Sequence, residues 1–374
     1  MELSRASTVN VYSTRRRALA RVTITQVAAH AGVSVASASR ALNGLIASPQ
    51  TIEKVQHAAD ELGYVADATA QSLKRGRTNQ LAYAVADIGN PVYVEMMTAV
   101  ERVVSASGYR LVLSSMGTLS SSVDVVRDLS RGYVDGMILS PLRVTDELLA
   151  VLAKTSVPVV VLGHLPDEQS IDNVRADSRT AMRLVVDHLV AEGRSDVAFV
   201  NGPSDTTPGA FRRDGFAAAV AAHPEISARS VEAEDFTIAA GYAAARRVLS
   251  GGSRPDAIIG ANDLIGIGAI RAAEDFGLSI PGDIAVTGID NTELAGVVRP
   301  GLTSVDLGAE ERGRAAAELL LKRIRNPERP AQTIAVAPSL VVRGSSLAST
   351  PDPASSSARG HTEHTDLNEE REAG

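Results

Sequence analysis

The sequence predicts a two-part protein, with a small all-α head joined to an α/β body that contains two doubly wound parallel-sheet subdomains. Three observations lead to this fold class. Short, closely spaced helical signals occupy residues 22–66. From residue 79 to residue 345, apolar strand-like runs alternate with amphipathic helical runs, which is typical of parallel sheets built from βαβ units. This alternation occurs in two successive series, and 374 residues are enough for two or three compact units.

Composition limits the class of protein. Hydrophobic residues make up 44% of the chain and charged residues 22%, as in ordinary soluble globular proteins. No apolar run approaches the roughly twenty residues of a membrane helix. No apolar stretch follows Arg15, Arg16 and Arg17, so we expect no secretory signal and a cytoplasmic location. Cysteine is absent, which excludes disulfides and thiolate metal sites, and no motif for a metal or a cofactor is found.

The charge is unevenly distributed along the chain. The net charge is −7, yet residues 1–80 hold ten Lys and Arg against five Asp and Glu, whereas the remainder holds 27 against 39. A basic head on an acidic body indicates that the head meets a polyanion. A solvated N-terminal arm would give the same pattern, so charge alone leaves both interpretations open.

The first two helices of the head are predicted from their ends. Thr23 and Gln26 form a capping box at the start of the first helix. Gly32 ends this helix, because glycine adopts a left-handed turn at no steric cost. Ser34 caps a second helix, which runs to about Leu42.

A third helix completes the head, and the segments on either side of it are irregular. Ser48 followed by Pro49 begins this helix, and Gly63 ends it. The irregular segments are a flexible arm over residues 1–21, a hinge over residues 67–78 and a disordered tail over residues 346–374 that is rich in Ser, Pro and Glu.

Two short helices that meet at a glycine are typical of a helix-turn-helix, whose second helix enters the DNA major groove. Arg40 can pair bidentately with a guanine, and Val35 and Ala36 can contact thymine methyl groups. A small helical cap with no ligand would show the same two helices, so this segment alone leaves both interpretations open. The predicted contacts are with bases for Val35, Ala36, Ser37, Ser39 and Arg40, and with phosphates for Thr23, Ser34, Ser37 and Asn43.

In the body, each strand candidate is an apolar run and each helix candidate has an amphipathic pattern. The strands of the first series are Leu81–Ala86, Arg110–Ser114, Gly136–Leu139 and Val157–Leu162, and those of the second are Val197–Val200, Ser230–Phe236, Ala257–Ile259 and Ile284–Gly288. The helices include Val92–Ser107, Ala181–Glu192, Ala210–Ala222, Ala239–Leu249 and Leu264–Phe276, and a helix Ala309–Ile324 with a strand Thr333–Val336 closes the body.

Longer runs of the chain carry a resemblance to a known family. Residues 27–43, which read VAAHAGVSVASASRALN, resemble the head of the lactose-repressor (LacI/GalR) family of transcription regulators. The resemblance covers about residues 22–346 in the family's order, and it implies a sequence-specific DNA-binding regulator, more often a repressor, with a body of the periplasmic-binding-protein-like type. The further matching motifs are Glu61–Tyr64, Ala70–Leu73, Asp87–Pro91, Arg131–Gly136, Ala261–Asp263, Ile280–Asp283 and Gly288–Asn291.

The chain departs from the family pattern at two places. The loop of residues 44–48 is one residue shorter than is usual, and Ala66 stands where the family often has proline. The resemblance implies that the hinge becomes a helix only on the operator. There Leu73 would wedge into the minor groove, and the small side chain of Ala70 would let two hinge helices approach. A flexible solvated linker is the alternative interpretation.

The resemblance also implies that a small molecule, the effector, binds in a cleft between the two subdomains. Carboxylates, an amide, a guanidinium and aromatic rings suit a sugar or another polyol. Residues 205–209 do not match the pattern of the family's purine sensors, which disfavours a purine. Asp263 could instead stabilise a helix start. The predicted effector-binding residues are Asp87, Tyr93, Arg212, Phe236, Asn262, Asp263 and Asp290.

The sequence disfavours two other classes of protein. A sugar-binding transport protein shares the two-lobed fold but needs no DNA-binding head. An enzyme is not expected, because the chain has no phosphate loop, no Gly-x-Ser-x-Gly and no His-Glu-x-x-His. The expected partners are double-stranded operator DNA, a small-molecule effector and a second copy of the chain. A homodimer is expected rather than a tetramer, because the tail holds only Leu347 and Leu367, too few for a coiled-coil seam.

Overall fold

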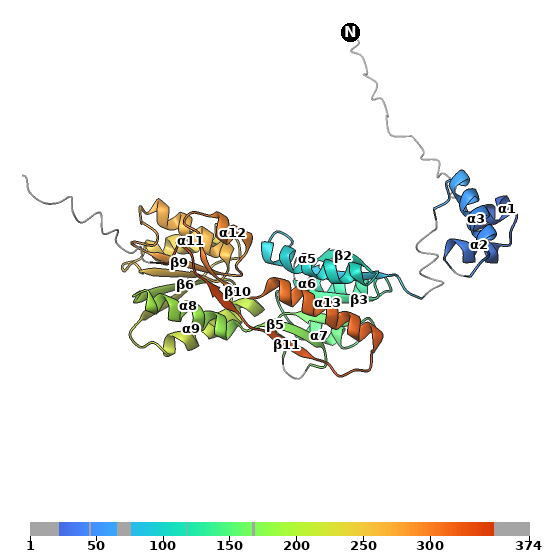
Figure 1. Ribbon diagram of the computed structural model, residues 1–374. Helices are drawn as coiled ribbons and strands as arrows, with labels where there is room; N and C mark the ends of the chain where they lie inside the picture. Colours follow the sequence, from blue (N-terminus) through green and yellow to red (C-terminus); the bar gives the residue numbers. More distant parts are fainter. Residues whose placement is uncertain (1–21, 45, 66–75, 118, 167–168, 348–374) are drawn as a thin grey trace, which may run out of the picture. The chain divides into compact units, whose positions relative to one another are not determined.

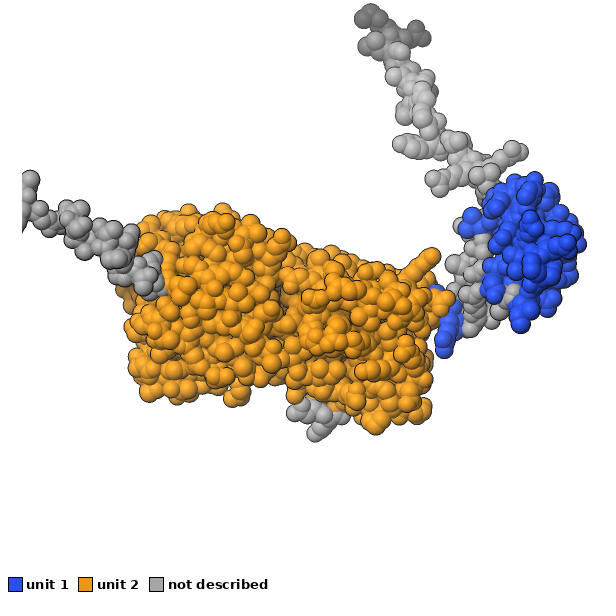
Figure 2. All heavy atoms as spheres, in the orientation of Figure 1, with its two compact units in different colours: residues 1–78 blue, residues 79–374 orange. Residues whose placement is uncertain are grey.

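A computed structural model of the chain separates into two compact units, residues 1–78 and residues 79–374 (Figures 1 and 2). The predicted arm, the end of the predicted tail from residue 348, and the hinge positions Ala70 and Leu73 lie outside the residues that the structure describes. Within those residues no helix is long and apolar enough to span a membrane. The described residues are 22–44, 46–65, 76–117, 119–166 and 169–347.

The described residues of the first unit form three helices around a core of small side chains. They are α1 (Ile24–His30), α2 (Val35–Leu42) and α3 (Pro49–Leu62). Side chains from all three helices are buried, and most of them are alanine or valine, which lets the helix backbones approach closely. The fully or nearly fully buried residues are Val27, Ala28, Ala38, Ala41, Val55, Ala58 and Ala59.

The predicted helix ends in the first unit are confirmed. The backbone N–H of Gln26 donates to the Thr23 hydroxyl at 3.4 Å, and the Gln26 side chain accepts from the Thr23 N–H at 2.8 Å, which completes the capping box. Ser34 caps α2 by accepting from the Ser37 N–H at 3.1 Å. Gly32, which follows α1, has a φ of +64°, the left-handed conformation expected of it.

The second unit contains two six-stranded sheets, each parallel except at one edge of the second. The first sheet has the order β11-β5-β4-β3-β1-β2, with β1 (Gln80–Val85), β2 (Arg110–Ser115), β3 (Gly136–Ser140), β4 (Val159–Leu162), β5 (Asp172–Ala176) and β11 (Thr333–Val336). The second has the order β12-β10-β9-β8-β6-β7, with β6 (Asp196–Asn201), β7 (Ser227–Glu232), β8 (Ala257–Gly260), β9 (Ala285–Ile289), β10 (Thr303–Asp306) and the antiparallel β12 (Ser339–Val341).

Helices pack against both sheets and complete two lobes, which we call lobe N and lobe C (Figure 1). The chain crosses between the lobes three times, after β5, after β10 and after β11. Lobe N is the first sheet with α5 (Pro91–Ala106), α6 (Leu119–Leu129), α7 (Asp146–Leu152) and α13 (Ala309–Arg325). Lobe C is the second sheet with α8 (Ser178–Ala191), α9 (Thr207–Ala221), α10 (Ile238–Leu249), α11 (Asp263–Asp275) and α12 (Glu293–Val297).

The predicted fold class is confirmed, while some strands differ from the prediction. The strand expected over residues 230–236 is β7, which begins and ends earlier, at Ser227 and Glu232. It is an edge strand of alternating exposure, so its apolar pattern is weak. Three further strands, β5, β10 and β12, were not predicted, because each has at most five residues and is interrupted by polar side chains.

Helices α10 and α11 approach each other backbone to backbone. A Cβ atom added at Gly268 would lie 2.4 Å from the Ile238 carbonyl oxygen, and one at Gly241 would lie 2.5 Å from the Ile265 Cα. Only glycine permits this separation. Because both helices begin at the surface between the lobes, their close packing also fixes the residues at their starts.

Candidate functional site

A cavity of about 510 Å³ lies between lobe N and lobe C. Both lobes contribute, for example Tyr93 and Leu162 from lobe N and Arg212 and Asp290 from lobe C. Several lining residues directly follow parallel strands, at the edge where open α/β sheets bind ligands. Of the seven residues predicted to contact a small molecule, six line this cavity: Asp87, Tyr93, Arg212, Phe236, Asn262 and Asp290.

A buried ion pair lies at the lobe C side of the cavity. The Arg212 Nη2 donates to Asp290 Oδ1 at 3.2 Å, and its Nη1 donates to the Ala261 carbonyl oxygen at 2.7 Å. Both residues are less than a tenth exposed, at 7% and 5%. Burial raises the pKa of the Asp290 carboxyl, and the charges of Arg212 and Arg312 oppose that rise. A buried pair of this kind is fixed in orientation and presents polar atoms to a ligand.

The backbone at Asp290 is in an unusual conformation. Its φ is +106°, and that of the next residue, Asn291, is +51°. Non-glycine residues adopt this region only where the surrounding structure imposes it, and such residues gather at functional sites. The conformation turns the Asp290 side chain from the end of β9 towards Arg212 and the cavity.

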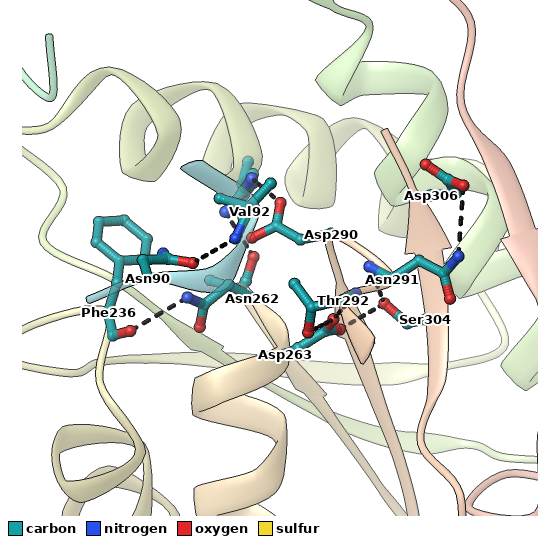
Figure 3. Close-up of polar contacts among 12 residues, drawn as sticks. Asn90, Val92, Phe236, Asn262, Asp263, Asp290, Asn291, Thr292, Ser304 and Asp306 are labelled. Carbon is teal, nitrogen blue, oxygen red and sulfur yellow. Dashed lines mark hydrogen bonds and ion pairs between the residues drawn. The ribbon is translucent and has the colours of Figure 1, made fainter. Parts of the chain in front are cut away.

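Asn262 and Phe236 are held against each other (Figure 3). Asn262 Nδ2 donates to the Phe236 carbonyl oxygen at 3.1 Å, while Asn262 Oδ1 caps α11 by accepting from the Ile265 N–H at 2.9 Å. The Phe236 ring lies over the backbone of Gly202, where an added Cβ would be 2.3 Å from it. These contacts present an aromatic face and an amide edge to the cavity.

Tyr93 and Asp87 occupy the lobe N side of the cavity. Tyr93 lies in the first turn of α5, and burial raises its pKa to about 12, so its hydroxyl is neutral and can both donate and accept. Asp87 is exposed at the rim, where its carboxylate accepts from the Gly89 N–H at 2.8 Å. On this side, a neutral hydroxyl therefore lines the interior of the cavity, and a carboxylate lies at its mouth.

Asp263 is the one of the seven predicted residues that does not line the cavity. Its Oδ2 accepts from the Thr292 N–H at 2.6 Å and from the Thr292 hydroxyl at 2.9 Å. Its Oδ1 accepts from the Ser304 hydroxyl (Figure 3). Asp263 is 1% exposed and acts as an anchor for the loop that carries Asp290. The structure thus supports the alternative interpretation, a structural role at a helix start.

The anchoring role of Asp263 predicts a pH dependence of stability. Burial raises its pKa from 3.8 to about 7, while the hydrogen bonds from Ser304 and Thr292 oppose this rise. The folded protein therefore holds a proton that the unfolded chain releases, and this contribution to stability is lost as the pH rises through about 7. We expect Asp263→Asn to flatten the decline of the melting temperature between about pH 4 and pH 7, the range between the ordinary and the raised pKa of this carboxyl. Thermal unfolding across this range measures the effect.

Asp283→Asn is the matched control for this experiment. Hydrogen bonds from Ser279 lower the pKa of Asp283, so this exposed carboxyl does not titrate in the same range. The control should reproduce the parent's pH profile. A profile of Asp263→Asn that is parallel to that of the parent would show that Asp263 stays ionised in the folded protein.

Arg312 and His164 are among the cavity residues that were not predicted from the sequence. Arg312 lies in the first turn of α13 and lines the cavity from lobe N. The run Glu310, Glu311, Arg312 has the composition of a solvated helix face, so nothing local distinguishes this arginine. His164 also lines the cavity and stacks on Phe211 with ring centroids 3.8 Å apart. A lone histidine in a loop carries no signal of such a partner.

The exposed surface of α2 carries the residues predicted to meet bases. Val35, Ala36 and Arg40 are exposed, and Val35 has 43% of its surface accessible. Ser37 and Ser39 are half-buried beside them. Since residues four positions apart lie on one helix face, Ala36 and Arg40 point the same way.

The residues predicted to meet phosphates also stabilise the helix ends. Thr23 and Ser34 are the caps of α1 and α2. Asn43 follows α2, where its Nδ2 donates to the Ser39 carbonyl oxygen at 2.6 Å. Thr23 and Ser34 remain exposed. The Thr23 hydroxyl also donates to Gln26 Oε1 at 3.2 Å, and the Ser34 hydroxyl is hydrogen-bonded to the Ser37 hydroxyl at 2.9 Å.

Two family models match the chain. Residues 23–67 match "Bacterial regulatory proteins, lacI family", and residues 186–346 match a "Periplasmic binding protein-like domain". The first match covers the helix-turn-helix of the head, and the second covers most of lobe C and the segments that return through lobe N.

Curated relatives match nearly over their full length. The ribose operon repressor of Escherichia coli (strain K12) is 31% identical over 327 residues, which cover 86% of this chain and 99% of the relative. The transcriptional repressor PurR of Aliivibrio fischeri (strain MJ11) is 30% identical over 331 residues, which cover 87% and 98%. Matches of this length include the head as well as the body, whereas a transport-type binding protein would match the body alone.

Two solved structures extend the comparison. The lac repressor dimer bound to operator and the anti-inducer ONPF has a TM-score of 0.80 at 27% identity, and the match covers 88% of this chain and 100% of that one. A complex of the transcriptional regulator CelR with cellobiose has a TM-score of 0.65 at 30% identity, with 87% and 100% covered. By its head, its two-lobed body and its relatives, the chain belongs to the lacI family of bacterial regulatory proteins.

Proposed function

We propose that the protein is a transcriptional repressor that binds operator DNA through residues 22–66 and responds to a sugar held in the cavity between its lobes. The observation that carries this proposal is the buried Arg212–Asp290 pair, which faces a cavity also lined by Asn262, Phe236 and Tyr93. Fixed donors and acceptors beside aromatic faces suit a polyhydroxylated ring. The cavity is large enough for a sugar of one or two rings, at about 510 Å³.

The names of the similar proteins support a small-molecule effector. One relative is a ribose operon repressor, and one similar structure holds cellobiose. PurR is a relative too, but residues 205–209 depart from the purine-sensor pattern, and Thr207 and Pro208 of this segment line the cavity. We therefore favour a sugar over a purine.

The proposed DNA complex contains two copies of the chain. One head offers few contacts, and a two-fold dimer places two heads on the half-sites of a palindromic operator. The similar lac repressor structure is a dimer on its operator. The hinge of residues 67–78, with Ala70 and Leu73, would join head to body on the operator, and operator binding would place the protein in the cytoplasm.

Arg40 is expected to read one guanine of each half-site. We expect Arg40→Ala to weaken operator binding by about 1–3 kcal/mol and to relax selectivity at that base pair, because a bidentate contact discriminates by this amount. Fluorescence anisotropy with operator variants measures both effects. Gln50→Ala is the surface control, because Gln50 is exposed on α3 and not on α2. If Arg40→Ala binds as tightly and selectively as the parent, α2 does not read the operator.

The direct test of the proposed function joins two measurements. A mobility shift with the DNA upstream of the chain's own gene tests operator binding, and a thermal-shift screen against sugars tests the cavity, since a ligand of the native state raises the melting temperature. A sugar that raises the melting temperature should also change operator affinity. Specific sugar binding without any DNA binding would instead indicate a transport-type protein.

A further inference from the structure

Arg312 is the cavity residue whose charge no side chain of the described structure balances directly. It enters the cavity from the first turn of α13, its side chain is half-buried, and its Nε is fully buried without a hydrogen-bond partner. Its side chain makes no hydrogen bond and no ion pair with any described residue. By contrast, two other arginines of α13 have carboxylate partners. Arg314 pairs with Glu311 and Glu318, and Arg323 donates to Asp172 at 2.9 Å.

The charges around Arg312 leave an excess of one positive charge inside the cavity. The carboxylate whose charge acts most strongly on it is Asp290, which is already hydrogen-bonded to Arg212. Tyr93 is neutral. Glu95 on α5 also senses the charge of Arg312, but it makes no ion pair with it and does not line the cavity. Two guanidinium groups therefore share one carboxylate, and a guanidinium does not lose its charge in proteins.

The acidic residues of the cavity do not offset this excess, because they lie at its mouth. Asp87 and Asp235 are exposed, and each accepts from a nearby backbone N–H, at 2.8 Å from Gly89 and 2.7 Å from Phe236. Water screens such exposed carboxylates strongly. The interior is thus positive, and the rim is negative.

The backbone adds to the positive potential of the interior. Five helices of at least twelve residues, α5, α8, α9, α10 and α11, each place a residue of their N-terminal end in the cavity lining. The N-terminal end of a helix carries a partial positive charge. The residues that these five helices place in the lining are Asn90, Ser178, Thr207, Thr237 and Asn262.

We propose that the effector is a sugar acid, a polyhydroxylated compound with one carboxylate, and that this carboxylate pairs with Arg312. The inference rests on the proposed function and specifies its ligand. The Arg312 guanidinium has no counter-ion of its own among the described residues, and sugar hydroxyls donate and accept without supplying charge. A single carboxylate matches the excess of one charge, whereas a phosphate carries about −1.5 to −2.

The test compares neutral sugars with the acids of the same ring. Isothermal titration of the full chain with D-glucose and D-glucuronate, and with D-galactose and D-galacturonate, should show the acid of a pair binding at least tenfold more tightly. Glucose 6-phosphate tests whether the cavity prefers a phosphate to a carboxylate. Tighter binding of glucose 6-phosphate than of glucuronate would overturn the choice of a carboxylate. Equal or tighter binding of the neutral sugar would overturn the inference and leave the proposed sugar regulator standing.

Variants assign the preference to Arg312. We expect Arg312→Leu to weaken binding of the acid at least tenfold while binding of its neutral partner is kept, and Arg312→Lys to retain part of the preference for the acid. Arg314→Leu removes a cation from the same helix outside the cavity and should keep the parent's preference. If the folded Arg312→Leu variant keeps the parent's preference for the acid, the carboxylate of the sugar acid binds elsewhere. If the chain binds its operator but neither the neutral sugars nor the sugar acids stabilise it, the proposal of a sugar effector is itself wrong.

Discussion

Asp290→Asn is expected to abolish the effect of the effector on operator binding while operator affinity in its absence stays within a few fold of the parent. Asp290 is the carboxylate of the cavity interior, and it orients the Arg212 guanidinium through a contact of 3.2 Å. Asparagine preserves the shape, but it loses the charge that fixes Arg212 and replaces one of the two oxygen acceptors by a donor. The head forms a separate compact unit with its own core, so it does not depend on this carboxylate for its fold.

An effector shifts an equilibrium only by its differential affinity for the two states, which is typically worth about 1–3 kcal/mol. Loss of the ligand contact should remove all of that shift. Anisotropy of labelled operator, with and without the sugar found in the thermal-shift screen, measures it. Asp275→Asn serves as a control, because this carboxylate accepts from the Tyr242 hydroxyl at 2.6 Å, away from the cavity lining. A full response of Asp290→Asn at the same sugar concentration would remove Asp290 from the binding site.

Gly268→Val is expected to destabilise the second unit by about 3 kcal/mol or more, because overpacking against backbone atoms cannot be relieved by a side-chain rotation. A Cβ at this position would lie 2.4 Å from the Ile238 carbonyl oxygen and 2.5 Å from the Tyr242 N atom. Either α10 or α11 must move, and with it the start of α10 or the Asn262 cap of α11. Sugar binding should therefore weaken together with stability.

Thermal and urea unfolding measure this loss, and Gly252→Val is the matched control. Gly252 has open space where a Cβ would be placed, and its φ is not in the left-handed region. The control should stay within about 0.5 kcal/mol of the parent, as is usual at exposed sites. If Gly268→Val unfolds at the same urea concentration as the parent, the two helices do not pack as closely as described.

The local signals in the sequence predicted those parts of the fold that depend on local chemistry. Helix ends marked by Thr23, Ser34 and Gly32 were found, because capping and left-handed turns depend on a few adjacent residues. Long apolar strands in the sheet interior were found as well. The short strands β5 and β10 were missed, because their formation depends on pairing with residues far away in the chain.

The same distinction between local signals and long-range packing explains which residues of the candidate site could be predicted. The predicted cavity residues came from the resemblance to a family, which records position in the fold indirectly. Arg312 was not among the positions that the resemblance implied, and only the packing of α13 against lobe N turns it towards the cavity. Asp263 was predicted from the same resemblance as its neighbour Asn262, but only Asn262 lines the cavity, because adjacent residues at a helix start point in different directions.

The three crossings between the lobes also determine when the protein can fold during its synthesis. Lobe N begins at residue 79, yet α13 and β11, which complete it, span residues 309–325 and 333–336. Until the ribosome has made them, one face of the nascent sheet, including Leu81 and Ile138, has no helix α13 to cover it. Lobe C likewise waits for β12 at residues 339–341. Both halves of the body therefore complete their folding late, after nearly all of the chain has been synthesised, whereas sequential domains would each fold as soon as they are made.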